Sequence, residues 1–198
     1  MRKDYEIILK LIPENSKVLD IGCSDGELIS YLENKGVSAQ GVELNQEKVI
    51  KCLEKGLDVI HGDINLIVED FPFNQFDYCL LTQTIQAVQK PDKLLNTLKK
   101  VSKNIIVSFN NSARLSKILN FLLSGSFDSL LKKADSDHWY NTDYIHPCSI
   151  KDFKKLAENL DLKIISTFDV INQRKFENGK IPSNLFCCLL YTSDAADD

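Results

Sequence analysis

The residues with the clearest chemical potential stand in one short loop. The loop, DIGCSDG, runs from Asp20 to Gly26 and separates strand-forming residues from a helical pattern. Gly22 and Gly26 let the backbone turn tightly and approach a ligand closely, because no Cβ stands in the way. The helix that follows begins with free N–H groups that point toward the same place. Such a loop is typical of a cofactor site.

The spacing within this loop argues against a cofactor that carries a phosphate. A dinucleotide site uses G-x-G-x-x-G, whereas here Ser24 stands between Gly22 and Gly26. A P-loop needs a lysine after its last glycine, and Glu27 stands there instead. Asp25 would also repel a phosphate. These residues favour S-adenosylmethionine, whose sulfonium and ammonium tolerate carboxylates, and they disfavour a nicotinamide-dependent oxidoreductase.

Two further carboxylates follow the next two predicted strands. Glu43 ends the second strand, about 20 residues after the loop begins, where a carboxylate binds ribose hydroxyls. Asp63 follows the third strand, where it can accept a hydrogen bond from an adenine amino group. One such residue alone is more often a solvated cap. The residues expected to hold S-adenosylmethionine or S-adenosylhomocysteine are Asp20, Gly22, Ser24, Gly26, Glu43 and Asp63.

Strands and helices that alternate through the first ~110 residues must position these side chains, and they predict a parallel sheet with helices on both faces. The predicted strands are 17–21, 39–44, 58–61, 76–82, 105–109, 162–171 and 183–191. The predicted helices are 5–12, 27–35, 46–55, 91–102, 115–123 and 150–159. We therefore expect a Rossmann-like α/β fold, with a mostly parallel, twisted sheet and an antiparallel element at its C-terminus.

The bulk composition narrows the classes of function. The 198 residues fit one domain, and 24 Lys and Arg against 28 Asp and Glu give a charge of −4, which argues against nucleic acid as a partner. We expect no membrane span and no secretory signal, because no sufficiently long apolar run exists. The six cysteines are scattered without a C-x-x-C pair. This favours reduced thiols in the cytoplasm over disulfides or a metal site.

The motifs resemble those of a known family. DIGCSDG with Glu43 and Asp63 is similar to class I S-adenosylmethionine-dependent methyltransferases, although these usually have glycine where Ser24 stands. A closer resemblance is to the MetW family of methionine biosynthesis proteins, and it covers residues 1–186. It is carried by VLDIGCSDGEL, GVELNQEKV, FPFNQFDYCLLTQTIQAVQKP and WYNTDYIHPCSIKDF. The resemblance implies the class I methyltransferase fold and a MetX-like partner, homoserine O-acyltransferase.

A genuine methyltransferase that acts on a small molecule is the alternative. Methyl transfer needs little beyond positioning and, for a protonated acceptor, a base. The candidates for the acceptor site are Gln83, Tyr140 and His146. Of these, His146 could act as the base, although such a histidine is more often a turn residue. An open cavity beside Gln83 and His146 would favour the enzyme. An exposed apolar patch around Trp139 would favour the partner role.

The last residues carry a signal of another kind. The ending CLLYTSDAADD, from Cys188 to Asp198, resembles the in-frame translation of a transposase sequencing adapter. We therefore expect a single methyltransferase-like domain over residues 1–187 and an adapter-derived tail over residues 188–198. The composition of this ending would also suit a strand.

Overall fold

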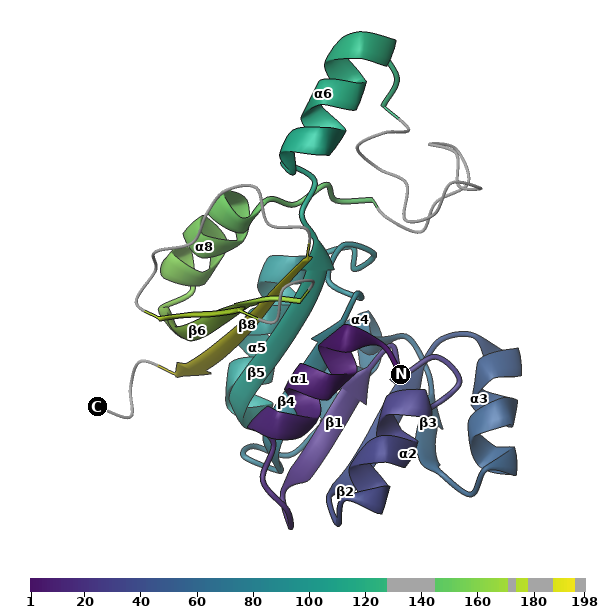
Figure 1. Ribbon diagram of the computed structural model, residues 1–198. Coiled ribbons are helices and arrows are strands. Elements are labelled where there is room, and N and C mark those ends of the chain that lie inside the picture. Colours follow the sequence, from purple (N-terminus) through teal and green to yellow (C-terminus); the bar gives the residue numbers. More distant parts are fainter. Residues whose placement is uncertain (128–144, 171–173, 178–186, 195–198) are drawn as a thin grey trace.

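A computed structural model describes residues 1–127, 145–170, 174–177 and 187–194. Within these ranges one sheet has the strand order β3-β2-β1-β4-β5-β8-β6-β7 (Figure 1). The strands are β1 (Lys17–Ile21), β2 (Ser38–Glu43), β3 (Asp58–His61), β4 (Phe76–Thr82), β5 (Ser102–Asn110), β6 (Leu162–Asp169), β7 (Arg174–Glu177) and β8 (Cys187–Asp194). Strands β1 to β5 pair in parallel, and β8 pairs antiparallel with β5 and β6. The predicted sheet is confirmed.

Helices cover both faces of this sheet. They are α1 (Lys3–Leu11), α2 (Glu27–Asn34), α3 (Gln46–Glu54), α4 (Ile64–Ile67), the 3-10 turn η1 (Val68–Asp70), α5 (Pro91–Val101), α6 (Leu115–Ser124) and α8 (Ile150–Asn159). Side chains of α1, α2 and α3 join Val18 and Leu80 in one buried cluster. Side chains of α4, α5 and α8 join Leu19 and Leu81 in the other. Neighbouring residues of β1 and β4 point to opposite faces, and both faces are covered, so most residues of these two strands are apolar.

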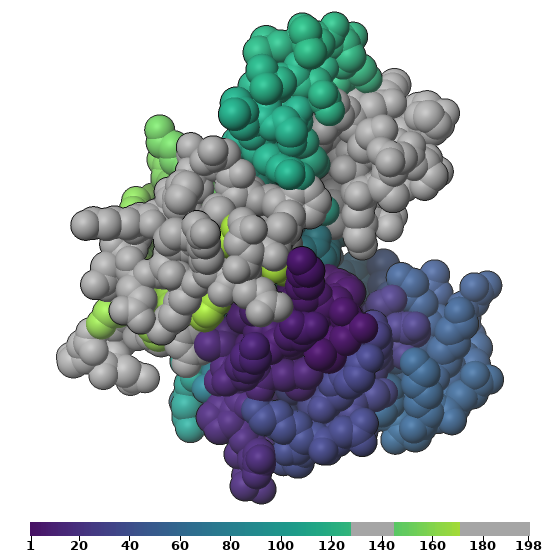
Figure 2. Space-filling model, viewed as in Figure 1, coloured from purple at the N-terminus to yellow at the C-terminus, as the bar shows by residue number. Residues whose placement is uncertain are grey.

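The first helix lies over the face of the sheet that α2 also covers. Its residues form part of the molecular surface in Figure 2, where they are purple. The rings of Tyr5 and Tyr31, from α1 and α2, have centroids 6.5 Å apart. Ile8 of α1 is fully buried. Helix α1 is therefore a stably packed part of the domain, and its first turn lies close to the carboxyl end of β5, where Ser108 contacts Asp4.

Helix α6 differs from the other helices, because it projects away from the sheet (Figure 1). None of its residues is buried. Leu119, Leu122 and Leu123 are exposed, the last at 86%. None of the helices in the described ranges has the length and apolar character needed to cross a bilayer.

The observed elements differ from the predicted ones in several places. Strand β5 begins at Ser102 rather than at residue 105, and the short elements α4 and β7 were not predicted. Strand β8 is described from Cys187 to Asp194, so it continues past the predicted end at residue 191 and includes part of the expected tail; the predicted strand residues 183–186 lie outside the described residues. The backbone of β8 pairs with β5 and β6. Because backbone pairing is open to residues of any type, it does not test whether the tail comes from an adapter sequence. The domain boundary at residue 187 therefore stays a prediction.

Candidate functional site

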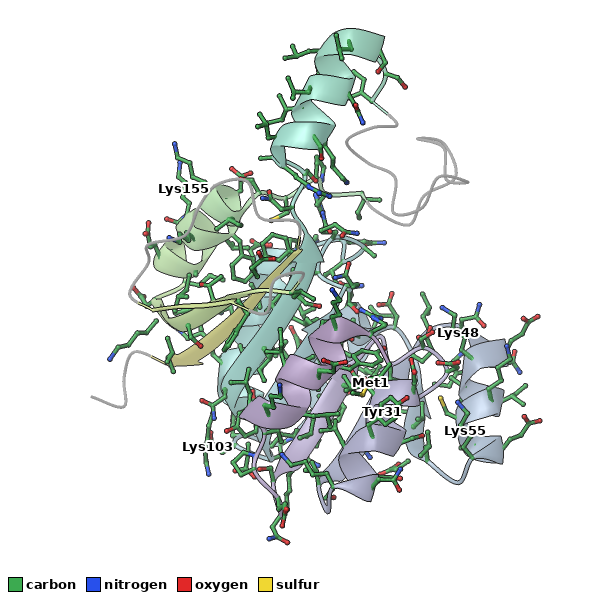
Figure 3. All side chains as sticks on the ribbon, viewed as in Figure 1. Met1, Tyr31, Lys48, Lys55, Lys103 and Lys155 are labelled. Carbon is green, nitrogen blue, oxygen red and sulfur yellow. The ribbon has the colours of Figure 1, made fainter. Side chains whose placement is uncertain are left out.

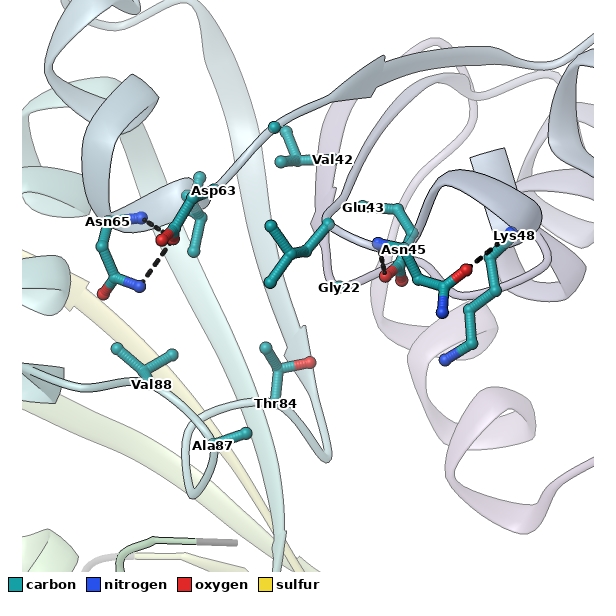
Figure 4. Close-up of a pocket in the computed structure, with 13 residues that line it drawn as sticks. Gly22, Val42, Glu43, Asn45, Lys48, Asp63, Asn65, Thr84, Ala87 and Val88 are labelled. Atoms are coloured by element: carbon teal, nitrogen blue, oxygen red, sulfur yellow. Dashed lines mark hydrogen bonds between the residues drawn. The ribbon is translucent and has the colours of Figure 1, made fainter. Parts of the chain in front are cut away.

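A pocket of about 600 Å³ lies at the carboxyl ends of β1, β2 and β3 (Figure 4). It lies at the edge where the strand order changes direction, between β1 and β4, and open parallel sheets bind their ligands at such a point. Gly22, Glu43 and Asp63 line it, together with Thr84 from the loop after β4. Three of the six predicted cofactor residues thus meet in one cavity, whose volume suits a small ligand.

Gly22 forms the part of the pocket wall where a backbone can come close to a ligand. Its φ of 73° lies in the left-handed region that favours glycine, and its N–H donates to the Val42 carbonyl at 2.8 Å. A Cβ at this position would lie 2.7 Å from Thr84 Oγ1. That hydroxyl donates to the Ile21 carbonyl at 2.9 Å, so it cannot move freely. A side chain at Gly22 would therefore disturb the loops after β1 and β4 together.

Ser24 and Gly26 shape the loop but do not line the pocket. Ser24 has a φ of 55°, and its N–H donates to Glu43 Oε2 at 2.8 Å. Gly26 has a φ of 75°, and a Cβ there would lie 2.3 Å from Leu57 Cδ1. Both positions hold the turn that starts α2, so they act on a ligand only through the shape of the loop.

Glu43 at the end of β2 and Asp63 after β3 line the pocket, and each can accept further hydrogen bonds. The Glu43 carboxylate accepts the N–H group of Asn45 at 2.8 Å (Figure 4) and also that of Ser24 at 2.8 Å. Asp63 caps α4, and its Oδ1 accepts from the backbone N–H of Asn65 at 2.9 Å and from its Nδ2 at 2.7 Å. A carboxylate offers about four acceptor positions. Each residue can therefore also accept from a ligand hydroxyl or amino group.

Asp20 lies deeper than the pocket wall. It is 1% exposed, and neither of its carboxyl oxygens has a hydrogen-bond partner. Burial raises the pKa of Asp20 to about 7; the Arg2 guanidinium opposes the shift, and the carboxylates of Glu43 and Asp4 add to it. An unpartnered buried carboxyl is costly to a fold. Asp20 therefore fits a cofactor with a cationic group that supplies the missing donor.

Lysine side chains near the site have separate roles. Lys48 and Lys55 lie toward the two ends of α3 (Figure 3). Lys48 lines the pocket, whereas Lys55 Nζ donates to the Asp25 carbonyl at 2.6 Å and supports the loop after β1. Sequence reasoning missed Lys48 and Thr84. Their signal was their position, since each stands shortly after the end of a strand at the pocket edge.

The candidate acceptor-site residues lie apart from this pocket where the structure describes them. Gln83 turns the chain at the end of β4 with a φ of 62° and does not line the pocket. His146 donates its N–H to the Gln86 carbonyl at 3.0 Å, and its Nε2 lies 3.3 Å from the Gln89 carbonyl. His146 is thus held by the segment that follows β4, whereas Gln83 donates its N–H to the Ser108 carbonyl of β5 at 2.9 Å. Tyr140 and Trp139 lie outside the described residues.

Solved structures with this architecture define the class. An S-adenosylmethionine-dependent methyltransferase from Methanosarcina mazei superposes with a TM-score of 0.70 at 14% identity, over 95% of this chain and 96% of the other. A magnesium protoporphyrin IX methyltransferase from Synechocystis, with S-adenosylhomocysteine bound, gives a TM-score of 0.68 at 13% identity, over 98% and 83%. The protein has the class I S-adenosylmethionine-dependent methyltransferase fold.

The family is given by sequence comparison. The family model described as "Methionine biosynthesis protein MetW" matches residues 2–190. The "Bifunctional methionine biosynthesis protein MetXA/MetW" of Rhodopirellula baltica is 32% identical over 170 residues, which cover 81% of this chain and 27% of that protein. The chain belongs to the MetW family. It spans about a quarter of the length of this curated relative.

Proposed function

We propose that this protein binds S-adenosylmethionine or S-adenosylhomocysteine and acts with a MetX-like homoserine O-acyltransferase in methionine biosynthesis. The observation that carries the proposal is the curated relative, whose name joins MetXA and MetW in one polypeptide. Because the relative joins MetXA and MetW in one polypeptide, we expect a separate MetW chain to associate with a separate MetX-like chain. The family resemblance described above implies that this partner is the acyltransferase.

The pocket supports the ligand part of the proposal. Glu43 would accept from the ribose hydroxyls and Asp63 from the adenine amino group, while Gly22 lets the backbone approach the ligand. Ser24, whose N–H donates to Glu43, and Gly26, where a Cβ would overlap Leu57, would keep the loop in shape. The sulfonium group of S-adenosylmethionine would supply the methyl group for transfer if an acceptor were present, and the thioether S-adenosylhomocysteine would be the product.

We also propose the cytoplasm as the location of the protein. The cysteines that the structure describes with their side chains, Cys23, Cys52, Cys79 and Cys148, are free thiols. Free thiols are the usual state in a reducing compartment. Periplasmic or extracellular fractionation of the native protein would contradict this proposal.

The test is an acyltransferase assay. Homoserine O-acyltransferase from the same source is assayed with each acyl-CoA donor, with and without this chain, while S-adenosylmethionine is titrated. We expect acyl transfer to depend on the chain and to respond to the ligand. The variant Gly22→Val should lose the ligand response, because its side chain would meet Thr84. Gly56→Ala is the matched control, since Gly56 has a φ of 75° but open space around it.

The same assay addresses the alternative, a methyltransferase that acts on a small molecule. Gln83 and His146 lie outside the pocket lining, so the described residues offer that alternative less support. If the acyltransferase ignored the chain, the partner proposal would be withdrawn. Release of S-adenosylhomocysteine with an added acceptor would then establish the alternative.

A further inference from the structure

Helix α6 exposes four apolar side chains on one side, which we call the α6 face. Its residues Leu115, Ile118, Leu119 and Leu122 are 54%, 37%, 48% and 70% exposed. The helix projects away from the sheet (Figure 1), and none of its ten residues is buried. Soluble proteins rarely leave a continuous apolar surface in water, and such a surface marks an interaction site.

The spacing of the α6 face is that of a helix that binds in a groove. Its residues stand at positions i, i+3, i+4 and i+7, so they lie on the same side of the helix. An amphipathic helix that lies in a hydrophobic groove of another protein uses these positions as anchors. The rings of Phe121 and Phe127 have centroids 5.1 Å apart, and Phe127 is 61% exposed. They add apolar surface near the end of the helix at Ser124.

Helix α3 also exposes apolar side chains, but it is packed in a different way. Ile50 and Leu53 are 47% and 56% exposed, whereas Val49 and Cys52 of the same helix are buried in the domain. Helix α6 has no buried residue that would hold it in the same way. A helix of ten residues is marginal in water without tertiary packing. A partner that covers the α6 face would supply that packing.

We propose that the α6 face is the surface by which this protein binds its MetX-like acyltransferase, and that the helix lies in an apolar groove of that enzyme. This inference rests on the proposed function and names the surface through which the partners associate. The name of the Rhodopirellula baltica relative joins MetXA and MetW, and the matched region covers 27% of its length. A second, larger part thus stands beside the MetW region in that polypeptide, which favours a MetX-like protein as the occupant.

A second copy of this chain is a less suitable occupant of the α6 face. A helix of ten residues is about 15 Å long, so two α6 helices packed side by side would bury far less than the about 800 Å² per partner of a stable interface. Residues 115–124 include Lys117 and no Asp or Glu, so two copies of the helix could form no ion pair with each other. A groove surrounds the helix on several sides and therefore buries more apolar surface.

Binding of the full chain to homoserine O-acyltransferase from the same source tests the inference, and isothermal titration calorimetry measures it. We expect Leu119→Gln/Leu122→Gln to bind at least about tenfold more weakly than the unchanged chain, because two apolar side chains would no longer be buried on association. The matched control is Ile50→Gln/Leu53→Gln, which makes the same kind of change at the same spacing on α3 and should bind as the unchanged chain does.

Urea unfolding of the free chain shows whether the α6 variant still folds. Because Leu119 and Leu122 are exposed, we expect Leu119→Gln/Leu122→Gln to unfold at the same urea concentration as the unchanged chain. A loss of stability would show that the α6 face is packed within this chain and would overturn the inference. A dimer of the unchanged chain that the same variant dissociates would assign the face to a second copy and would also overturn it.

Hydrogen exchange gives a readout that needs no substitution. We expect the backbone amides of residues 115–124 to exchange rapidly in the free chain and slowly in the complex with the acyltransferase. The amides of α5, whose Leu95 and Leu98 are fully buried, should exchange slowly in both. Unchanged exchange of residues 115–124 in the complex would overturn the inference.

The outcomes separate the binding surface from the partnership itself. If the acyltransferase bound the unchanged chain and the α6 variant equally well, the inference would be overturned and the proposed function would stand. If the unchanged chain neither bound the acyltransferase nor changed its activity, the proposed function would fall, and this inference with it.

Discussion

The loop after β1 and helix α6 differ in how far the protein itself holds them in place. In the loop, Gly22 and Gly26 are enclosed so closely that an added Cβ would meet Thr84 or Leu57. In α6 no residue is buried, and Leu123 is 86% exposed. The loop is therefore formed before any ligand binds, because contacts within the chain determine its shape. Substitutions should have large effects on stability in the first region and small ones in the second.

The largest effect is expected at Gly26. In Gly26→Ala the new Cβ would lie 2.3 Å from Leu57 Cδ1 and 3.0 Å from Cys52 Sγ, both on buried side chains. Overlap and the left-handed backbone together should cost about 3 kcal/mol in the free energy of unfolding, measured with urea. Gly56→Ala has the same backbone strain but nothing within 4 Å, and it should cost about 1 kcal/mol. Equal losses in the two variants would show that the enclosure of the loop adds nothing.

A second prediction concerns Asp20 in the ligand-free protein. Its pKa of about 7 in the folded protein lies above the ordinary value of 3.8, so it favours folding at low pH and this contribution is lost as the pH rises through 7. Asp20→Asn removes that loss. Relative to the unchanged protein, its free energy of unfolding should increase by about 2–3 kcal/mol between pH 5 and pH 8. The control Asp25→Asn should show no such change when urea unfolding is measured at the two pH values. If the stability of Asp20→Asn changed with pH in the same way as that of the unchanged protein, the result would be inconsistent with a buried, unpartnered carboxyl group at this position.

A third substitution separates loop stability from ligand binding. Glu43→Gln keeps one carbonyl oxygen for the N–H groups of Ser24 and Asn45, and places an NH₂ where the other oxygen stood. It should cost about 1.5 kcal/mol in stability and also weaken binding of S-adenosylhomocysteine. Thermal unfolding and calorimetry measure the two effects. Glu47→Gln, at an exposed position in the first turn of α3, is the control for the change of charge.

The smallest effect is expected in α6. Leu122→Gln should change the free energy of unfolding by less than about 0.5 kcal/mol, because Leu122 is already 70% exposed. Leu95→Ala, at a fully buried position of α5, should lose about 2–5 kcal/mol in the same urea titration. A large loss for Leu122→Gln would mean that α6 contributes to the core in solution and would remove the contrast between the two regions.

The sequence predicts those parts of the site that depend on local conformation. The structure brings Gly22, Glu43 and Asp63 to one edge, because βα units bring the ends of successive parallel strands together, while their role in binding a ligand stays a prediction. The arrangement around Asp20 was not predictable in this way. It depends on Arg2 and Asp4 of α1, whose position over β1 follows from tertiary packing rather than from any spacing in the motif.

Helix α6 also shows what a sequence pattern leaves open, here for an exposed helix. The apolar pattern predicts a helix over 115–123, and the structure has one at Leu115–Ser124. Periodicity states which side chains share a face, but it contains no information about what that face contacts. The exposure of Leu119, Leu122 and Leu123 could therefore be found only from the structure.

Two contacts at the carboxyl ends of the central strands connect distant parts of the chain. Thr84 Oγ1 donates to the Ile21 carbonyl across 63 residues, and Ser108 Oγ donates to Asp4 across 104. Closing loops of this length is slow, so these contacts should form late during folding. A ligand that binds only after these contacts have formed would then not be bound in the folding transition state. It should prolong the lifetime of the native protein by slowing unfolding, while the rate at which the chain first folds stays almost unchanged.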